Sequence, residues 1–156
     1  TAVEAIKEFN AVEHRLEVVR EINGVKWYND SASSSPSRTI AGLNAYDEEI
    51  VLIAGGYDKN LDYDILGKYI VKKVKALVLI GNKAKKILDA TTKEIEKQGV
   101  ELPICFCQTL GDAVKAAKQV AKENQVVLFS PASASFDMFK NFADRGNQFK
   151  KLVNEL

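Results

Sequence analysis

The feature that most constrains this chain is the alternation of short apolar runs with longer polar segments from residue 49 onward. The apolar runs lie at 49–54, 76–80, 103–106 and 125–129, and each is followed by a segment suited to a helix. Continuous apolar runs are typical of strands buried on both faces, and their alternation with helices predicts a parallel sheet. We therefore expect one α/β domain with a doubly wound, mostly parallel, Rossmann-like sheet.

The helices expected from this pattern cover most of the remaining chain. One begins at Pro36, because proline suits the first turn of a helix. Together with a short amphipathic helix near the N-terminus, the predicted helical ranges are 2–9, 36–45, 64–73, 83–97, 110–122 and 136–154.

A hairpin is expected ahead of the alternating region. Two strand-like segments, 15–22 and 25–28, flank the dipeptide Asn23-Gly24. Asn-Gly tolerates the positive φ values of a type I′ turn and is a strong hairpin signal. The sequence therefore predicts an N-terminal antiparallel hairpin at the edge of the sheet.

Composition excludes several classes of function. The chain has 156 residues, 46% of them hydrophobic, and a formal net charge of +1. These values fit a single globular domain with no general attraction for nucleic acid or for a membrane surface. No apolar run approaches the ~20 residues of a membrane-spanning helix, and no signal-peptide pattern is present. We expect a cytoplasmic protein.

The cysteines and the single histidine give little support for metal or hydrolytic chemistry. Cys105 and Cys107 lie two residues apart in an expected strand, and so on one face. A one-residue gap is poor spacing for a zinc site, so we expect a buried, reduced pair and no metal site. His14 has no serine or cysteine partner in sequence reach with which to form a catalytic triad.

Three loops are expected at the carboxyl edge of the sheet, where open α/β sheets bind their ligands. In the first, 29–37, Asp30 and a run of serines precede a helix whose free N–H groups favour an anion. Serine is also a preferred N-cap, so helix capping is the alternative reading. Asp30, at the end of a strand, is placed to hold a ribose hydroxyl, to orient a lysine or to bind a metal ion.

The second loop, 55–60, starts with Gly55-Gly56 directly after a strand. Paired glycines let a ligand or another loop approach the backbone closely, and Lys59 adds a positive charge. The alternative is a tight turn with a solvated lysine. The segment is not a P-loop, because that motif needs a longer glycine-framed loop that ends in Lys-Ser or Lys-Thr.

The third loop, 130–135, again places small and hydroxyl residues between a strand and an expected helix. Its backbone N–H groups, with Ser133 or Ser135, suit a carboxylate. Three aromatic residues follow at helical spacing, namely Phe139, Phe142 and Phe149. We expect at least two of them to lie in the core. Three anion-suited loops at one edge predict a site for a small acidic molecule.

Several segments carry a resemblance to a known family. They are Phe9 with His14-Arg-Leu-Glu17, residues 24–31, residues 53–59, and residues 130–142 with Arg145-Gly146. On these segments the chain resembles the C-terminal domain of the Mur ligases, and among them those that add D-glutamate. The resemblance runs through essentially the whole chain, and its last segment is the most specific.

The resemblance implies an ATP-dependent amide ligase of peptidoglycan precursor synthesis, and so of cell-wall formation, cell shape and cell division. In such an enzyme ATP phosphorylates the carboxylate of UDP-N-acetylmuramoyl-L-alanine, and the amine of D-glutamate attacks the acyl phosphate. ATP and Mg²⁺ would bind mainly to upstream domains of the same protein. Residues 1–156 would form one C-terminal domain, with residues 1–10 the end of the interdomain connection, and this domain alone is expected to be inactive.

The resemblance also implies roles for single residues. Lys59 and Ser34 would hold the α-carboxylate of D-glutamate. Ser135 and the start of the last helix, with Phe136 and Phe142 nearby, would receive its side-chain carboxylate.

The remaining roles concern ATP and the reaction centre. Arg15 and Asp30 would contact ATP, and His14, like Lys59, would lie at the catalytic centre. One departure from the family pattern stands in the first loop, where Ala32 replaces a common lysine and lowers the local charge by one.

Two alternatives to this reading stay open. One is another amide ligase of the same superfamily, such as one that adds L-glutamate to a folate or a cell-wall acceptor, and the chirality of the bound glutamate would separate it. The other is a stand-alone α/β module that binds a small dicarboxylate or nucleotide. A complete module would bind its ligand at micromolar concentration, whereas a domain with half of a shared site would bind at millimolar concentration or not at all.

Overall fold

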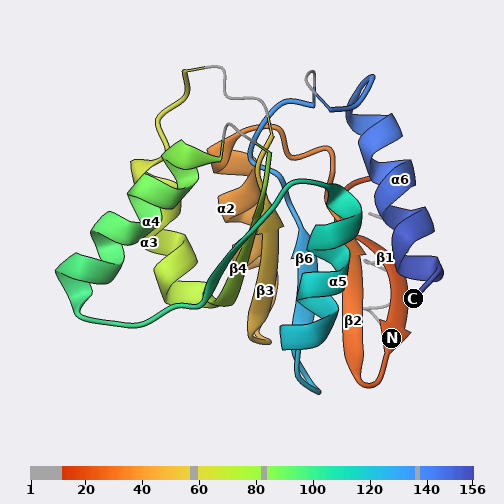
Figure 1. Ribbon diagram of the computed structural model, residues 1–156, viewed down its shortest axis with the longest axis horizontal. Coiled ribbons are helices and arrows are strands. Elements are labelled where there is room, and N and C mark those ends of the chain that lie inside the picture. The colour runs from red at the N-terminus through yellow and green to blue at the C-terminus, as the bar shows by residue number, and fades with distance from the viewer. Residues whose placement is uncertain (1–11, 57–59, 82–83, 136–137) are drawn as a thin grey trace.

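The computed structural model of the protein describes residues 12–56, 60–81, 84–135 and 138–156. In this part of the chain one sheet is flanked by helices (Figure 1). Its elements are β1 (Glu17–Ile22), β2 (Val25–Asn29), α2 (Pro36–Asn44), β3 (Ile50–Ala54), α3 (Asp64–Lys73), β4 (Val74–Ile80), α4 (Lys85–Gln98), β5 (Ile104–Cys107), α5 (Leu110–Val120), β6 (Val126–Phe129) and α6 (Phe142–Asn154). The helix expected at 2–9 lies outside the described residues.

The sheet has the strand order β1-β2-β6-β3-β4-β5. β1 pairs with β2 antiparallel, and the other pairings are parallel. The predicted doubly wound sheet with an antiparallel hairpin at its edge is therefore confirmed. Because β6 inserts between β2 and β3, the order of the chain reverses there, and such a switch point is where open α/β sheets bind ligands.

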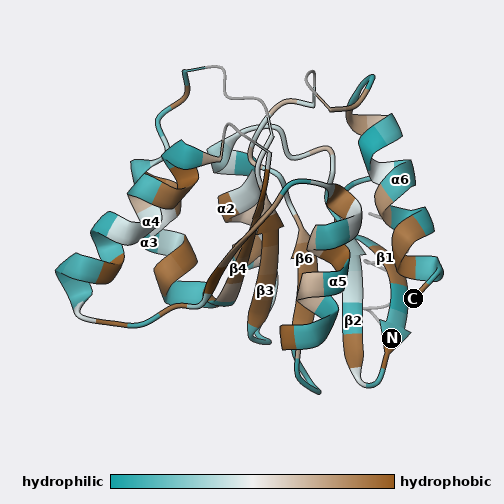
Figure 2. Cartoon of the chain, viewed as in Figure 1, coloured by the Kyte–Doolittle hydropathy of each residue, from teal (hydrophilic) through white to brown (hydrophobic). Residues whose placement is uncertain are grey.

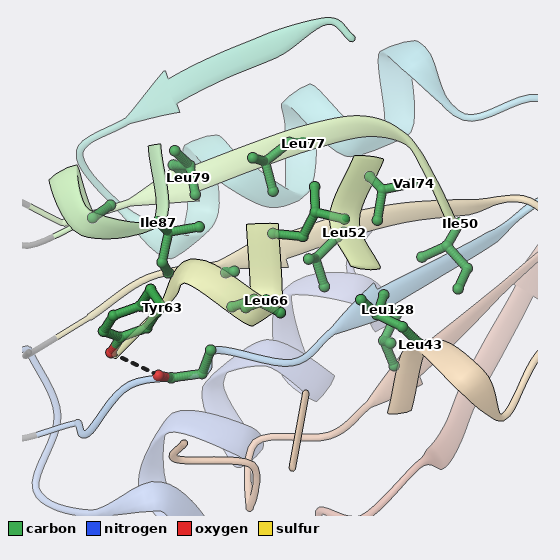
Figure 3. Close-up of a cluster of buried hydrophobic side chains, with 14 of the residues drawn as sticks. Leu43, Ile50, Leu52, Tyr63, Leu66, Val74, Leu77, Leu79, Ile87 and Leu128 are labelled. Atoms are coloured by element: carbon green, nitrogen blue, oxygen red, sulfur yellow. Dashed lines mark hydrogen bonds between the residues drawn. The ribbon is translucent and has the colours of Figure 1, made fainter. Parts of the chain in front are cut away.

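The helices cover both faces of the sheet and enclose two apolar clusters. Alternate side chains of β3 point to opposite faces, so Leu52 packs with α2, α3 and α4 while Ile53 packs with α5 and α6. Figure 2 shows β3 and β4 as apolar along their length, with hydrophilic residues on the outer surfaces of the helices. Figure 3 shows the first cluster, where Leu66 of α3 and Leu43 of α2 point toward the strands.

The hairpin turn takes the predicted form. Asn23 and Gly24 have φ values of 51° and 79°, and Ile22 pairs with Val25 across the turn. Positive φ at both central residues is what a type I′ turn requires. The prediction from Asn-Gly is therefore confirmed.

The prediction of a buried cysteine pair is wrong. Among the described strands β5 pairs with β4 alone, at the edge of the sheet, and there Cys105 is exposed and Cys107 is half-buried. Both are free cysteines. The apolar residues around them correctly indicate a strand. They do not indicate that this strand lies at the edge of the sheet, because that depends on the topology.

The predicted start of the last helix is also wrong. α6 begins at Phe142, because Asn141 caps it by accepting a hydrogen bond from the N–H of Asp144 at 2.8 Å. Just before it, the N–H of Phe139 bonds to the carbonyl of Ser135 at 2.9 Å, which closes a turn. None of the described helices is both long enough and apolar enough to cross a membrane.

Candidate functional site

The three loops predicted to form the site follow three neighbouring strands. β2, β6 and β3 lie side by side and are parallel, so their carboxyl ends meet at one edge of the sheet, at the top of Figure 1. The prediction that these loops share an edge is confirmed. They converge at the switch point of the topology, the position at which open α/β sheets bind their ligands.

A buried carboxylate joins the loop after β2 to the loop after β6. One oxygen of Asp30 accepts hydrogen bonds from the hydroxyls of Ser33 at 2.6 Å and Ser130 at 2.7 Å. The other oxygen accepts the N–H of Leu16 at 3.2 Å. Burial raises the pKa of Asp30, and these hydrogen bonds together with the charge of Arg15 only partly oppose that effect. Asp30 therefore fixes the shape of two loops from within.

The serines of the first loop act as internal links and not as helix caps. Ser35 is the N-cap of α2, yet its side chain makes no capping hydrogen bond. Ser33 donates to Asp30, and Ser31 donates to the carbonyl of Phe142 at 2.7 Å. The capping alternative does not account for this loop, because its hydroxyls connect it to α6 and to Asp30.

A buried guanidinium also joins the loops, and the sequence analysis named this arginine only as part of the resemblance, with no role in the site. Arg145 of α6 is only 1% exposed. It donates to the carbonyl of Ser31 at 2.7 Å, to the hydroxyl of Ser31 at 3.0 Å and to the carbonyl of Ser133 at 2.8 Å. A further contact reaches the hydroxyl of Ser34 at 3.4 Å. A positive charge therefore lies behind a serine that is predicted to hold a carboxylate.

His14 is held beneath the start of α6. It is buried, and its Nδ1 lies 2.9 Å from the side-chain amide nitrogen of Asn29, within hydrogen-bonding distance. Its ring meets Phe142 edge-on with 6.0 Å between ring centroids. Gly146 of α6 makes room for it, because a Cβ there would overlap Nδ1 of His14.

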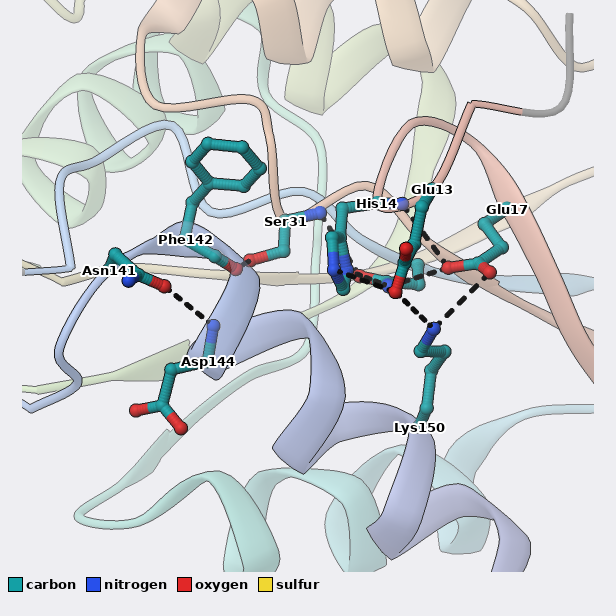
Figure 4. Close-up of polar contacts among 9 residues, drawn as sticks. Glu13, His14, Glu17, Ser31, Asn141, Phe142, Asp144 and Lys150 are labelled. Atoms are coloured by element: carbon teal, nitrogen blue, oxygen red, sulfur yellow. Dashed lines mark hydrogen bonds and ion pairs between the residues drawn. The ribbon is translucent and has the colours of Figure 1, made fainter.

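A carboxylate cluster surrounds the histidine, as Figure 4 shows. Glu13 lies 3.3 Å from Nε2 of His14, and Lys150 of α6 bridges Glu13 and Glu17 at 3.3 Å each. Burial acts to raise the pKa of Glu17, but the N–H of His14, the amide of Asn29 and the ammonium of Lys150 together hold it below its usual value. The entry to β1 is thus fastened to α6.

The loop after β3 is pressed against its neighbours by its two glycines. A Cβ at Gly55 would overlap the carbonyl of Ile80, and one at Gly56 would lie 2.7 Å from the carbonyl of Ala134. The N–H of Gly55 donates to the carbonyl of Pro131 at 2.9 Å. The predicted close approach is therefore that of neighbouring protein segments: a side chain at Gly55 would meet the end of β4, and one at Gly56 would meet the loop after β6.

The remaining predicted site residues differ in their exposure. Arg15 is exposed, Ser34 is half-buried and Ser135 is buried. Lys59 and Phe136 lie outside the described residues. The roles assigned to all of these residues stay predictions.

Of the three phenylalanines, Phe149 is fully buried, Phe139 packs against the α5–α6 cluster and Phe142 is 45% exposed. Phe149 is therefore in the core as predicted, whereas Phe139 is only partly buried against it. Phe142 alone of them faces solvent, next to His14.

Sequence comparison relates the chain to ligases. The family model described as "Mur ligase, glutamate ligase domain" matches residues 14–133. The UDP-N-acetylmuramoylalanine--D-glutamate ligase of Acetivibrio thermocellus is 57% identical over 150 residues, which are 95% of this chain and 32% of that protein. The ligase of the same name from Clostridium botulinum is 51% identical over 96% of this chain and 33% of its own length. The chain thus spans about a third of the length of these curated relatives.

Solved structures share the fold at lower identity. UDP-N-acetylmuramate-alanine ligase MurC from Thermotoga maritima matches with a TM-score of 0.64 and 18% identity, over 97% of this chain and 32% of its own. FolC of E. coli in complex with ADP matches with a TM-score of 0.60 and 15% identity, over 92% of this chain and 32% of its own. At such identities the likeness concerns the fold alone.

Proposed function

The chain belongs to the Mur ligase, glutamate ligase domain family, and from this we propose that it is the C-terminal, D-glutamate-receiving domain of a peptidoglycan-precursor ligase. The whole enzyme would join D-glutamate to UDP-N-acetylmuramoyl-L-alanine at the expense of ATP. The observation that carries the proposal is the 57% identity, along 95% of the chain, to a ligase named for that reaction.

The domain's part in the reaction is to place the amine of D-glutamate. Ser34 and Lys59 would hold the α-carboxylate, and Ser135 with Phe136 and Phe142 would receive the side-chain end. Support comes from the geometry around Ser34, since its hydroxyl lies at the carboxyl edge of the sheet with the guanidinium of Arg145 behind it. A fixed positive charge under a hydroxyl favours a carboxylate in front of it.

ATP, when bound, supplies the phosphoryl group that activates the acceptor carboxylate. The exposed guanidinium of Arg15 fits a phosphate, because it is free to reach one from the edge of this domain. Asp30 fits a direct contact less well, since both of its oxygens accept hydrogen bonds from within the domain. We therefore assign to Asp30 the shaping of the loop that faces the nucleotide.

Mg²⁺ would be held outside this chain. Within the described part of the sequence, no group of three or more His, Cys, Asp or Glu side chains is arranged to hold a metal ion. The magnesium ligands and the phosphate loop would lie in upstream domains of the same protein, and this domain alone would not turn over ATP.

The test is an NMR titration of the 156-residue chain with D-glutamate and, in parallel, with L-glutamate. We expect millimolar binding of the D-enantiomer, with amide shifts in the loops after β2, β3 and β6. Ser34→Ala should weaken it, whereas Ser37→Ala, an exposed serine in the same region, should not.

Other outcomes of these measurements would support other functions for the chain. Equal or stronger shifts with L-glutamate would support a ligase of the folate-adding type. Micromolar binding of a dicarboxylate or nucleotide would support a stand-alone module. Phosphate release from ATP that depends on D-glutamate, measured on this chain free of other ligases, would contradict the proposal that it is one domain of the enzyme.

A further inference from the structure

The two cysteines form a pair of adjacent thiols on the outermost strand. In the sheet formed by the described residues, β5 pairs with β4 alone and lies two strands beyond β3, outside the three loops of the candidate site. Cys105 is exposed, Cys107 is half-buried, and their Sγ atoms are 3.8 Å apart. Residues two apart in a strand face the same side, so both thiols are presented together.

The distance between the two sulfurs matches a metal chelate. Thiolates bind Zn²⁺ at about 2.3 Å with tetrahedral angles, so two of them on one ion lie about 3.8 Å apart. The Sγ atoms of Cys105 and Cys107 already have this separation. An ion of that size would need little movement of either side chain.

The charges around the pair favour a cation. The pKa of Cys107 is raised to about 11 by burial, by its hydrogen bond to Cys105, and by the negative charges of Cys105 and Asp112. The carboxylate of Asp112 and the repulsion between two thiolates disfavour the ionised pair, and a divalent cation reverses both effects because it attracts the same charges. Binding therefore releases the thiol protons.

From this geometry, and against the expectation drawn from their spacing in the sequence, we infer that Cys105 and Cys107 bind one soft divalent ion, Zn²⁺ or Cd²⁺, as a two-thiolate chelate. The described part of the chain offers no third ligand from His, Cys, Asp or Glu in such a group, so the ion keeps open positions for water or a small thiol. The site is thus an exchangeable surface site and differs from a structural zinc site, which is closed by four protein ligands.

The experiment is a Cd²⁺ titration of the metal-free chain, reduced with a phosphine so that no added thiol competes. Sulfur-to-cadmium charge-transfer absorption in the ultraviolet should saturate at one ion per chain. A chelate gains from two linked ligands, so Cys105→Ser and Cys107→Ser should each weaken binding by about 100-fold or more. Zn²⁺ should compete for the same site only in large excess, because thiolates prefer the softer Cd²⁺.

Several results would overturn the inference. They are unchanged affinity in either single variant, retained binding in the double variant, and one ion shared between two chains. Ser37→Ala serves as a control, because this exposed serine lies on α2, far from β5 in the sheet order. Circular dichroism and thermal unfolding should show that the serine variants fold as the wild type does, since Cys105 is exposed and serine has nearly the same shape.

Discussion

Two buried charges of opposite sign hold the same pair of loops. Asp30 links the loops after β2 and β6 through hydroxyl donors, whereas Arg145 of α6 links them mainly through backbone carbonyls. A hydroxyl can turn to another acceptor when its partner is lost, but a buried carbonyl cannot. The guanidinium should therefore be the less replaceable of the two, and the serine-rich loops should owe their shape chiefly to α6.

The largest effect should come from Arg145→Met, which keeps an unbranched apolar stem and removes the guanidinium donors. The carbonyls of Ser31 and Ser133 would stay buried without their donors, at a cost of about 1–3 kcal/mol each, so we expect a loss of about 2–6 kcal/mol in the free energy of unfolding, measured with urea. The matched control is Arg20→Met, since Arg20 also donates to carbonyls, those of Val153 and Leu156, but is only half-buried. It should cost at most about 1 kcal/mol, and equal losses in both variants would contradict the comparison.

A smaller effect is expected where α6 rests on His14. In Gly146→Ala the new Cβ would overlap Nδ1 of His14 and lie 3.0 Å from the amide of Asn29, so overpacking should cost about 1–3 kcal/mol. Gly111→Ala in α5 meets nothing closer than 3.7 Å and should stabilise the protein by about 0.5–1 kcal/mol. The two helical glycines should thus respond with opposite signs in thermal unfolding.

The contribution of Asp30 to stability is tested by varying the pH. Because the pKa of Asp30 is raised in the folded protein, the unfolded chain loses this proton first as the pH rises above about 4. Wild-type stability should therefore fall relative to Asp30→Asn from about pH 4 up to the folded pKa, and then stay level. Urea denaturation between about pH 3.5 and 7 measures this difference, and a relative gain of the wild type with rising pH would show that its ionised form is favoured.

The smallest effect concerns a pair of buried tyrosines. The hydroxyl of Tyr46 is buried without a hydrogen-bond partner in the described part of the protein, so Tyr46→Phe should be neutral or stabilise by up to about 1 kcal/mol. Tyr63 donates to the carbonyl of Ala132 at 2.9 Å, as Figure 3 shows, so Tyr63→Phe should cost about 1 kcal/mol. Equal melting temperatures for the two variants would mean that a hydrogen-bond partner does not decide whether a buried hydroxyl stabilises this protein.

Local patterns made most of the fold predictable. The apolar runs and the Asn23-Gly24 turn reflect interactions over a few residues, so the strands, the hairpin and the shared edge of the three loops follow from them. The exposure of Cys105 depends on which strand lies at the edge, and that is decided by pairings between distant segments. The start of α6 had a local signal in Asn141 and Asp144, an N-cap pattern that lies after a hydroxyl-rich segment also suited to a helix start.

The candidate site was predictable in its location but not in its internal links. Arg145 lies in the first turn of α6, and an arginine on a helix is by default a surface residue, so its side chain type gives no sign that it reaches two loops. The neighbouring Gly146 is the one available signal, because glycine within a helix often marks a close approach of another segment. Its partner is His14, which lies at the other end of the sequence.

The insertion of β6 between β2 and β3 has a consequence for how the chain reaches its native state. Lys26 pairs with Val126, and Ile50 pairs with the same residue, so the centre of the sheet is completed by a strand made late in synthesis. Until β6 leaves the ribosome, no strand pairs the hairpin with β3. The edges of β2 and β3 that later pair with β6 are unpaired during this time. Such long sequence separations slow folding and leave aggregation-prone intermediates, so shielding of the nascent chain should matter most just before residue 126 appears.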